Sequence, residues 1–160
     1  LQLVFRPEAE TYFRELLHQQ PKDRWERFCR NKLLHQYGDF LGYALLGGDP
    51  DLQKKVQPLL PLAESNFFSL NGMIEVLMTH RAQPSLLQIE NWLKLAESLQ
   101  DETLDKERQA RFAYLQGFAA FLGGHQQEAL EAFYKSARIY PHPENASLSA
   151  LQKLGRQIPE

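Results

Sequence analysis

The apolar residues of this chain recur every three or four positions along most of its length. That spacing places them on one face of an amphipathic α-helix, and prolines stand where one periodic stretch ends and the next begins. The connections are short and polar, which favours antiparallel pairs of neighbouring helices. Expected N-caps are Asp49, Ser85 and Asn145. The pattern predicts helices at about residues 7–19, 22–47, 50–57, 62–81, 84–99, 105–123, 126–140 and 144–156.

The composition supports an all-α fold. Leu contributes 27 residues and Ala 14, whereas Ile, Val and Thr together contribute ten, so the residues that favour β-strands are scarce. A length of 160 residues suits one compact domain, and 43% hydrophobic with 24% charged residues is typical of a soluble folded chain. We therefore expect a single all-α domain over residues 1–160.

Internal repetition adds information about the arrangement of these helices. Leu62-Ala63-Glu64-Ser65 recurs 33 residues later as Leu95-Ala96-Glu97-Ser98, close to the period of about 34 residues that marks stacked helix hairpins. Within residues 110–143, small, aromatic and proline residues follow a definite spacing: Gly117, Ala129, Phe133, Ser136, Ala137 and Pro141. In that spacing the stretch resembles a tetratricopeptide repeat (TPR).

The resemblance implies a short TPR-like superhelix of stacked antiparallel helix hairpins. Residues 35–66 and 69–100 would form two weaker repeats before the clear one. In the first of these, Pro58 and Pro61 interrupt the second helix, so we expect Pro61 to open the following helix instead. The stack would be capped by helical residues 1–34 at one end and 144–156 at the other.

In TPR proteins the concave face is lined mainly by the first helix of each repeat and binds peptides or helices of partner proteins. The resemblance therefore implies a non-catalytic interaction module, such as a scaffold, chaperone or regulatory domain. The alternative for each apolar residue of this groove is that it belongs to the hydrophobic core. The implied groove residues are Tyr37, Phe40, Met73, Leu77, His80, Arg81, Arg111, Tyr114, Phe118 and Phe121.

A basic segment at residues 22–32 is the second candidate surface. Helical spacing puts Arg24, Arg27 and Asn31 on one face, expected to be solvated, and Trp25, Phe28, Cys29 and Lys32 on another, expected to be buried. A solvated face, phosphate, nucleic acid and an acidic partner segment all remain open, although a net charge of -2 argues against nucleic-acid binding by overall charge. The basic patch comprises Lys22, Arg24, Arg27 and Arg30.

The sequence carries no recognisable catalytic or metal-binding motif. Cys29 is the only cysteine, and the five histidines do not form HxxxH or HExxH spacings. GxSxG and GxxxxGK[ST] motifs are also missing. We expect no enzyme activity, no cofactor and no metal.

The chain ends and the hydropathy bear on context. The longest uncharged apolar stretch, Phe40 to Gly48, is far shorter than the ~20 residues of a membrane helix. The chain begins with Leu1 and carries no readable targeting signal, so we expect a fragment or a processed product. One alternative is a soluble, periplasmic regulatory tail of a larger membrane or catalytic protein. The compartment stays open, with the cytoplasm favoured, and so do the oligomeric state and the partner's identity.

Overall fold

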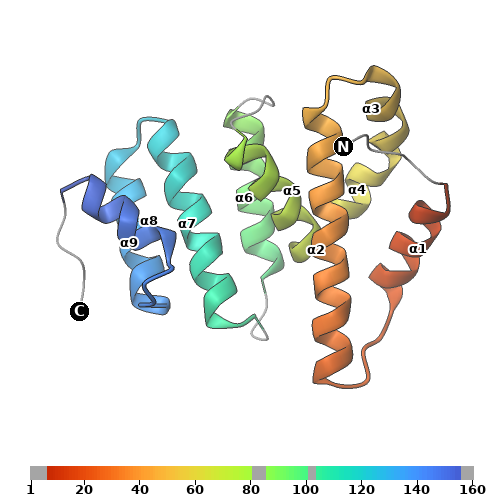
Figure 1. Ribbon diagram of the computed structural model, residues 1–160, viewed down its shortest axis with the longest axis horizontal. Coiled ribbons are helices and arrows are strands. Elements are labelled where there is room, and N and C mark those ends of the chain that lie inside the picture. Colours follow the sequence, from red (N-terminus) through yellow and green to blue (C-terminus); the bar gives the residue numbers. More distant parts are fainter. Residues whose placement is uncertain (1–6, 81–85, 101–103, 156–160) are drawn as a thin grey trace. The chain divides into compact units, whose positions relative to one another are not determined.

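The computed structural model describes residues 7–80, 86–100 and 104–155, and these residues form helices and connections without any strand (Figure 1). The all-α prediction is confirmed. The expected N-cap Ser85 and the expected groove residue Arg81 lie outside the described residues. The elements are α1 (Pro7–His18), α2 (Arg24–Leu46), α3 (Pro50–Val56), η1 (Gln57–Leu59), α4 (Leu60–Ala63), α5 (Phe67–Thr79), α6 (Leu86–Leu99), α7 (Lys106–Leu122), α8 (Gln126–Ile139) and α9 (Ala146–Lys153).

The helices group into two compact units. Unit 1 contains α1 to α5 together with residues 91–99 of α6, and unit 2 contains residues 86–90 of α6 together with α7, α8 and α9. Each unit has its own buried side chains. The single domain expected from the chain length stays a prediction.

Unit 1 is built around the packing of α2 on α5. Small residues let the two backbones approach closely: Gly38 lies against the backbone of Ser69, and a Cβ added to Gly42 would be 2.8 Å from Cβ of Val76. Residue numbers therefore rise together along the two helices, which run in the same direction (Figure 1). Gly72 of α5 makes a third close approach, because a Cβ added to it would lie 2.5 Å from the carbonyl oxygen of His35.

The connection between α2 and α5 consists of the three short elements α3, η1 and α4, and the weaker repeat expected over residues 35–66 stays a prediction. Pro58 and Pro61 stand in the first turns of η1 and α4, where a missing N–H costs nothing, so the expectation that Pro61 opens a helix is confirmed. The prediction of a single helix over residues 62–81 is wrong. Asn66 breaks it, since its side chain accepts hydrogen bonds from the N–H groups of Phe68 (2.9 Å) and Ser69 (3.3 Å) and begins α5.

Unit 2 contains an antiparallel hairpin over the stretch that resembles a TPR. A Cβ on Gly117 of α7 would lie 2.6 Å from Cε1 of Phe133 on α8, so a larger residue there would force the Phe133 ring to shift. Ser136 at the other end of the hairpin donates a 2.7 Å hydrogen bond to the carbonyl oxygen of Ala110. These contacts pair the start of α7 with the end of α8, as two helices joined by a short turn require.

The C-terminal helix α9 packs on α8, as the expected capping helix 144–156 should. Leu151 is fully buried in the cluster formed with α8, and Leu148 and Leu154 pack against it. Asn145 begins the helix by accepting a hydrogen bond from the N–H of Ser147 at 2.9 Å, which confirms that N-cap. Asp49 does the same for α3.

Among the residues that the structure describes, no helix combines the length and the apolar character that crossing a membrane would require.

Candidate protein-interaction surface

The start of α2 is fixed by local carboxylates. Asp23 is the N-cap and accepts a 2.8 Å hydrogen bond from the N–H of Glu26. The Glu26 side chain accepts one from the N–H of Lys22, also at 2.8 Å. An acidic N-cap followed three residues later by Glu is a helix-start signature that the sequence carried. Asp23 therefore satisfies an N–H group of α2, and Glu26 satisfies that of the residue before the N-cap.

Helix α1 is held against α2 by aromatic packing and by an arginine. Phe13 is buried and meets Tyr37 edge to face, with ring centroids 5.0 Å apart. Arg30 donates to the carbonyl oxygens of Leu16 (2.9 Å) and Leu17 (3.1 Å) at the end of α1, where carbonyls lack helical partners. Its placement in the basic patch is therefore corrected: Arg30 is half-buried and ties α1 to α2.

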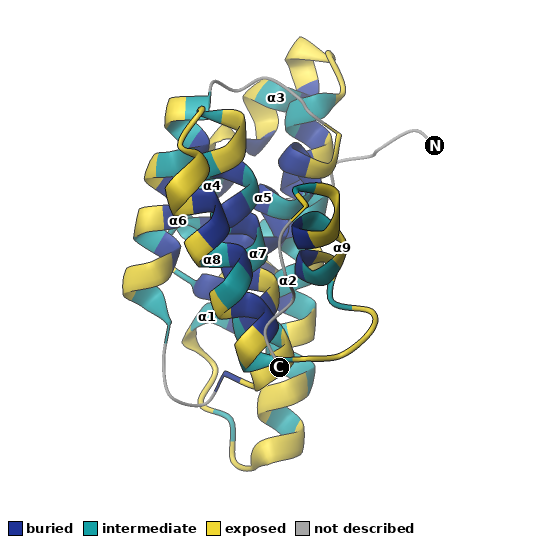
Figure 2. Ribbon diagram, turned by 90° about the vertical axis from the view of Figure 1, so that its left-hand side faces the viewer, coloured by how far each residue is buried: buried dark blue, intermediate teal, exposed yellow. Residues whose placement is uncertain are grey.

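The first turns of α2 are largely exposed (Figure 2). Trp25 is 70% exposed and Phe28 is 51% exposed, so the expectation that they are buried is wrong. Their rings stack on each other with centroids 5.7 Å apart and planes 22° apart. The basic neighbours are exposed as well. We call this set the aromatic–basic face; it comprises Arg24, Trp25, Arg27, Phe28 and Lys32.

A groove of about 580 Å³ lies beside this face, between the end of α1 and the start of α2. Trp25 forms part of its wall and so belongs to both surfaces. Cys29, expected to be buried, lines the groove and is half-buried. The other lining residues are Tyr12, Glu15, Leu16, His18, Gln19, Glu26, Arg30 and Leu33.

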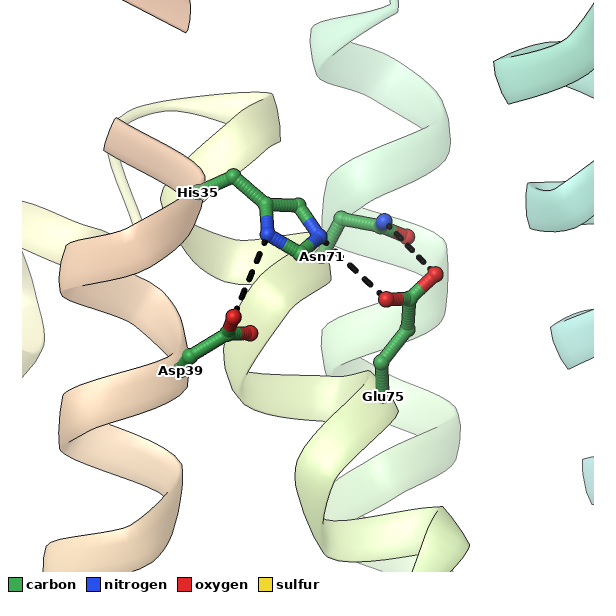
Figure 3. A network of polar contacts seen from close by, with 4 residues as sticks. All are labelled: His35, Asp39, Asn71 and Glu75. Carbon is green, nitrogen blue, oxygen red and sulfur yellow. Dashed lines mark hydrogen bonds and ion pairs between the residues drawn. The ribbon is translucent and has the colours of Figure 1, made fainter. Parts of the chain in front are cut away.

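A polar network that the sequence did not reveal joins α2 to α5 (Figure 3). The His35 ring lies between two carboxylates: Nε2 is 3.2 Å from Oε2 of Glu75, and Nδ1 is 3.5 Å from Oδ2 of Asp39. Asn71 donates to Oε1 of Glu75 at 3.4 Å. The side chains of His35 and Glu75 are only 15% and 14% exposed. The sole signal in the sequence was the spacing of four between His35 and Asp39.

This environment changes the protonation of His35. Burial by itself lowers the pKa, because it disfavours the charged ring, but hydrogen bonds to Asp39 and Glu75 and the charges of both carboxylates raise the pKa of His35 to about 9. The ring is therefore protonated at neutral pH and donates from both nitrogens. The network acts as an ion-paired clamp between two helices.

The expected groove residues of unit 1 are distributed over different environments. Met73 and Leu77 have no exposed surface and belong to the core, so neither can line a groove. The burial has a physical reason: α5 packs on α2, and most of its side chains are enclosed. Tyr37 packs against α1, and Phe40 is half-buried. The His80 ring meets Tyr43 edge to face at 5.5 Å.

In unit 2 the expected groove residues share one side of α7. Arg111 and Phe121 are exposed. Tyr114 and Phe118 are half-buried, with ring centroids 6.1 Å apart, and Tyr114 also lies 5.8 Å from the ring of Phe133. This side of α7 is partly accessible, and part of its aromatic surface serves the packing of α7 on α8.

Within residues 7–80, 86–100 and 104–155, no group of three or more His, Cys, Asp or Glu side chains is placed so that it could hold a metal ion. Comparison of the chain with protein-family models, with curated proteins and with solved structures finds no match.

Proposed function

We propose that this chain is a non-catalytic helical module, TPR-like in its stacking, that binds a segment of a partner protein as a scaffold, chaperone or regulatory domain. The observation that carries the proposal is the exposed stacked pair Trp25 and Phe28, of which Trp25 also lines the groove between α1 and α2. Trp, Tyr and Arg dominate the binding energy of protein interfaces. Arg24 and Arg27 flank the pair.

The physical argument rests on exposed apolar area. Each large aromatic side chain carries about 150–250 Å² of surface, and removing apolar area from water is favourable by about 25 cal/mol per Å². Trp25 and Phe28 recover only part of this on folding, because 70% of Trp25 and 51% of Phe28 stay in solvent. A partner that covers the pair supplies the missing burial.

The side of α7 that includes Tyr114, Phe118 and Phe121 is a proposed second contact in the same module. Its residues are those that the TPR resemblance assigns to partner binding. Phe121 is 49% exposed, and Leu122 beside it is exposed as well.

The test is selection of short peptides on the purified chain. A displayed library of peptides about 16 residues long is selected on the wild type, and enriched peptides are titrated against a variant carrying Trp25→Ser and Phe28→Ser. Hot-spot aromatics contribute about 2 kcal/mol or more each, so binding should weaken at least about tenfold. The matched control carries Leu87→Ser and Tyr43→Ser, two changes at exposed large side chains outside both proposed surfaces.

Two results would count against the proposal. Enriched peptides that bind the Trp25/Phe28 variant as tightly as the wild type would remove the α2 site. Tight binding of a labelled single-stranded oligonucleotide, lost in the same variant and steeply dependent on salt, would replace protein binding by nucleic-acid binding, because stacked aromatics among cations also suit single strands.

A further inference from the structure

The face of α2 that packs on α5 in the second half of the helix is exposed to solvent in the first half. One stripe runs along the helix at alternating spacings of four and three residues, which keeps its members on one face. The last three members, His35, Gly38 and Gly42, contact α5. The stripe comprises Arg24, Phe28, Asn31, His35, Gly38 and Gly42.

Helix α5 does not cover the first part of the stripe, because α5 is shorter than α2. Helix α2 has 23 residues and α5 has 13. Ser69, in the first turn of α5, already lies against Gly38, so residues 24–34 of α2 extend beyond the start of α5 (Figure 1). At 1.5 Å per residue this segment is about 16 Å long, which accommodates roughly three turns of another helix.

The open part of the stripe has its own chemistry. Phe28 and Trp25 form an apolar centre, and the exposed cations Arg24, Arg27 and Lys32 surround it. In contrast, the part of the stripe under α5 contains Gly38 and Gly42. Arg24, Arg27 and Lys32 make no ion pair with any residue that the structure describes. The nearby carboxylates cap the helix instead. A face with three positive charges therefore stands on a chain whose net charge is -2.

We infer that the partner segment is an acidic amphipathic helix that lies along residues 24–34 of α2, in line with α5. Its apolar side covers Trp25 and Phe28, and its carboxylates pair with Arg24, Arg27 and Lys32. This arrangement matches the general anatomy of interfaces, with an aromatic centre and a polar rim. The inference rests on the proposed function and adds the charge and conformation of the partner.

A helix is the occupant that the packing favours. The same stripe of α2 already accepts a helix over its second half, through contacts spaced as helix packing requires. An amphipathic helix lying in an apolar groove is also a common mode of peptide recognition, with anchors at i, i+3, i+4 and i+7. The cations fix the sign of the partner's charge, because like charges across an interface are disfavoured.

The peptide selection described above tests this inference through the sequences it enriches. Peptides that depend on Trp25 and Phe28 should be rich in Asp and Glu, with apolar residues at helical spacing. A proline placed in the middle of an enriched peptide should abolish its binding, since proline interrupts a helix. In the complex, the circular dichroism of the peptide should gain helical signal.

Charge reversal tests the electrostatic part. Reversing the three cations by Arg24→Glu, Arg27→Glu and Lys32→Glu should weaken binding of the enriched peptides by about tenfold or more. The control applies the same change in net charge at exposed lysines elsewhere, and it should alter binding less than about twofold. The control variant carries Lys54→Glu, Lys94→Glu and Lys135→Glu.

The results separate this inference from the proposed function. Neutral or extended peptides that still require Trp25 and Phe28 would leave the interaction module intact and overturn the acidic helix. If the enriched peptides bind equally well after Trp25 and Phe28 are replaced, both the acidic helix and the proposed binding site on α2 are overturned. Stronger binding to a labelled oligonucleotide, to vesicles of anionic lipid, or to a second copy of this chain, with the same dependence on the three cations, would replace the acidic helix by that occupant.

Discussion

The ion-paired clamp formed by His35, Asp39 and Glu75 predicts how the stability of unit 1 depends on pH. In the folded chain the pKa of His35 is raised from 6.5 to about 9. A raised pKa means that the folded state binds a proton more tightly than the unfolded state does. The resulting stabilisation is fully present below pH 6.5 and is lost as the pH rises through 9.

The magnitude follows from the size of the pKa shift. One pKa unit corresponds to about 1.4 kcal/mol, so the shift of His35 corresponds to about 3 kcal/mol of unfolding free energy. The side chain is only 15% exposed, so solvent screens its pairing with Glu75 weakly. Asp39 is 37% exposed, so solvent screens its pairing with His35 more strongly. We expect stability to fall by about 2–3 kcal/mol between pH 6.5 and 9.5.

The assay is urea unfolding followed by tryptophan fluorescence at several pH values. Both tryptophans, Trp25 and Trp92, belong to unit 1, so the signal reports the unit that contains the clamp. The reference is the variant His35→Gln, whose amide can still donate a hydrogen bond but does not titrate. The difference between wild type and variant removes the contributions of all other groups. Equal pH dependence of the two proteins between pH 6.5 and 9.5 would refute the reasoning.

Three other predictions follow from packing and exposure. Gly38→Ala should destabilise unit 1 by about 2 kcal/mol or more, because the added Cβ would collide with the backbone of α5, which cannot move aside as a side chain can; urea unfolding measures this loss. Ser136→Ala should cost about 0.5–1.5 kcal/mol, because it removes the buried hydrogen bond that joins α8 to the Ala110 carbonyl oxygen of α7; thermal unfolding measures it, and an unchanged midpoint would contradict it. Acrylamide should quench the fluorescence of Trp25, which is 70% exposed, far more than that of the buried Trp92; the single variants Trp25→Phe and Trp92→Phe separate the two signals, and equal quenching would contradict the exposure of α2.

The sequence predicted the helices well because their signals are local. Periodic apolar residues and prolines placed most helix ends close to the observed ones, including a helix start at Pro61, but the two short elements η1 and α4 were not predicted. The break before α5 was missed, although Asn66 is a favourable N-cap. The pairing of α2 with α5 was also missed. It depends on Gly38 and Gly42 meeting residues some 30 positions later, which periodicity within one helix does not encode.

The candidate site was predicted only in part, for the same reason. Apolar spacing within α2 made Trp25 and Phe28 read as core residues, but a helical face is buried only where another element covers it. Here α5 covers the second half of α2 and leaves the first half open. In contrast, the spacing of basic residues correctly placed Arg24 and Arg27 in solvent.

Exposure also decides which substitutions can separate binding from folding. Met73 and Leu77 are fully buried, and replacing such a residue by Ala costs about 2–5 kcal/mol, so a loss of binding there would have two explanations. Trp25 and Phe28 are 70% and 51% exposed, so their substitution should shift the unfolding midpoint much less than a core substitution does. A loss of partner binding in a chain that still unfolds at nearly the same urea concentration therefore identifies a recognition surface, because the fold is then retained without these two rings.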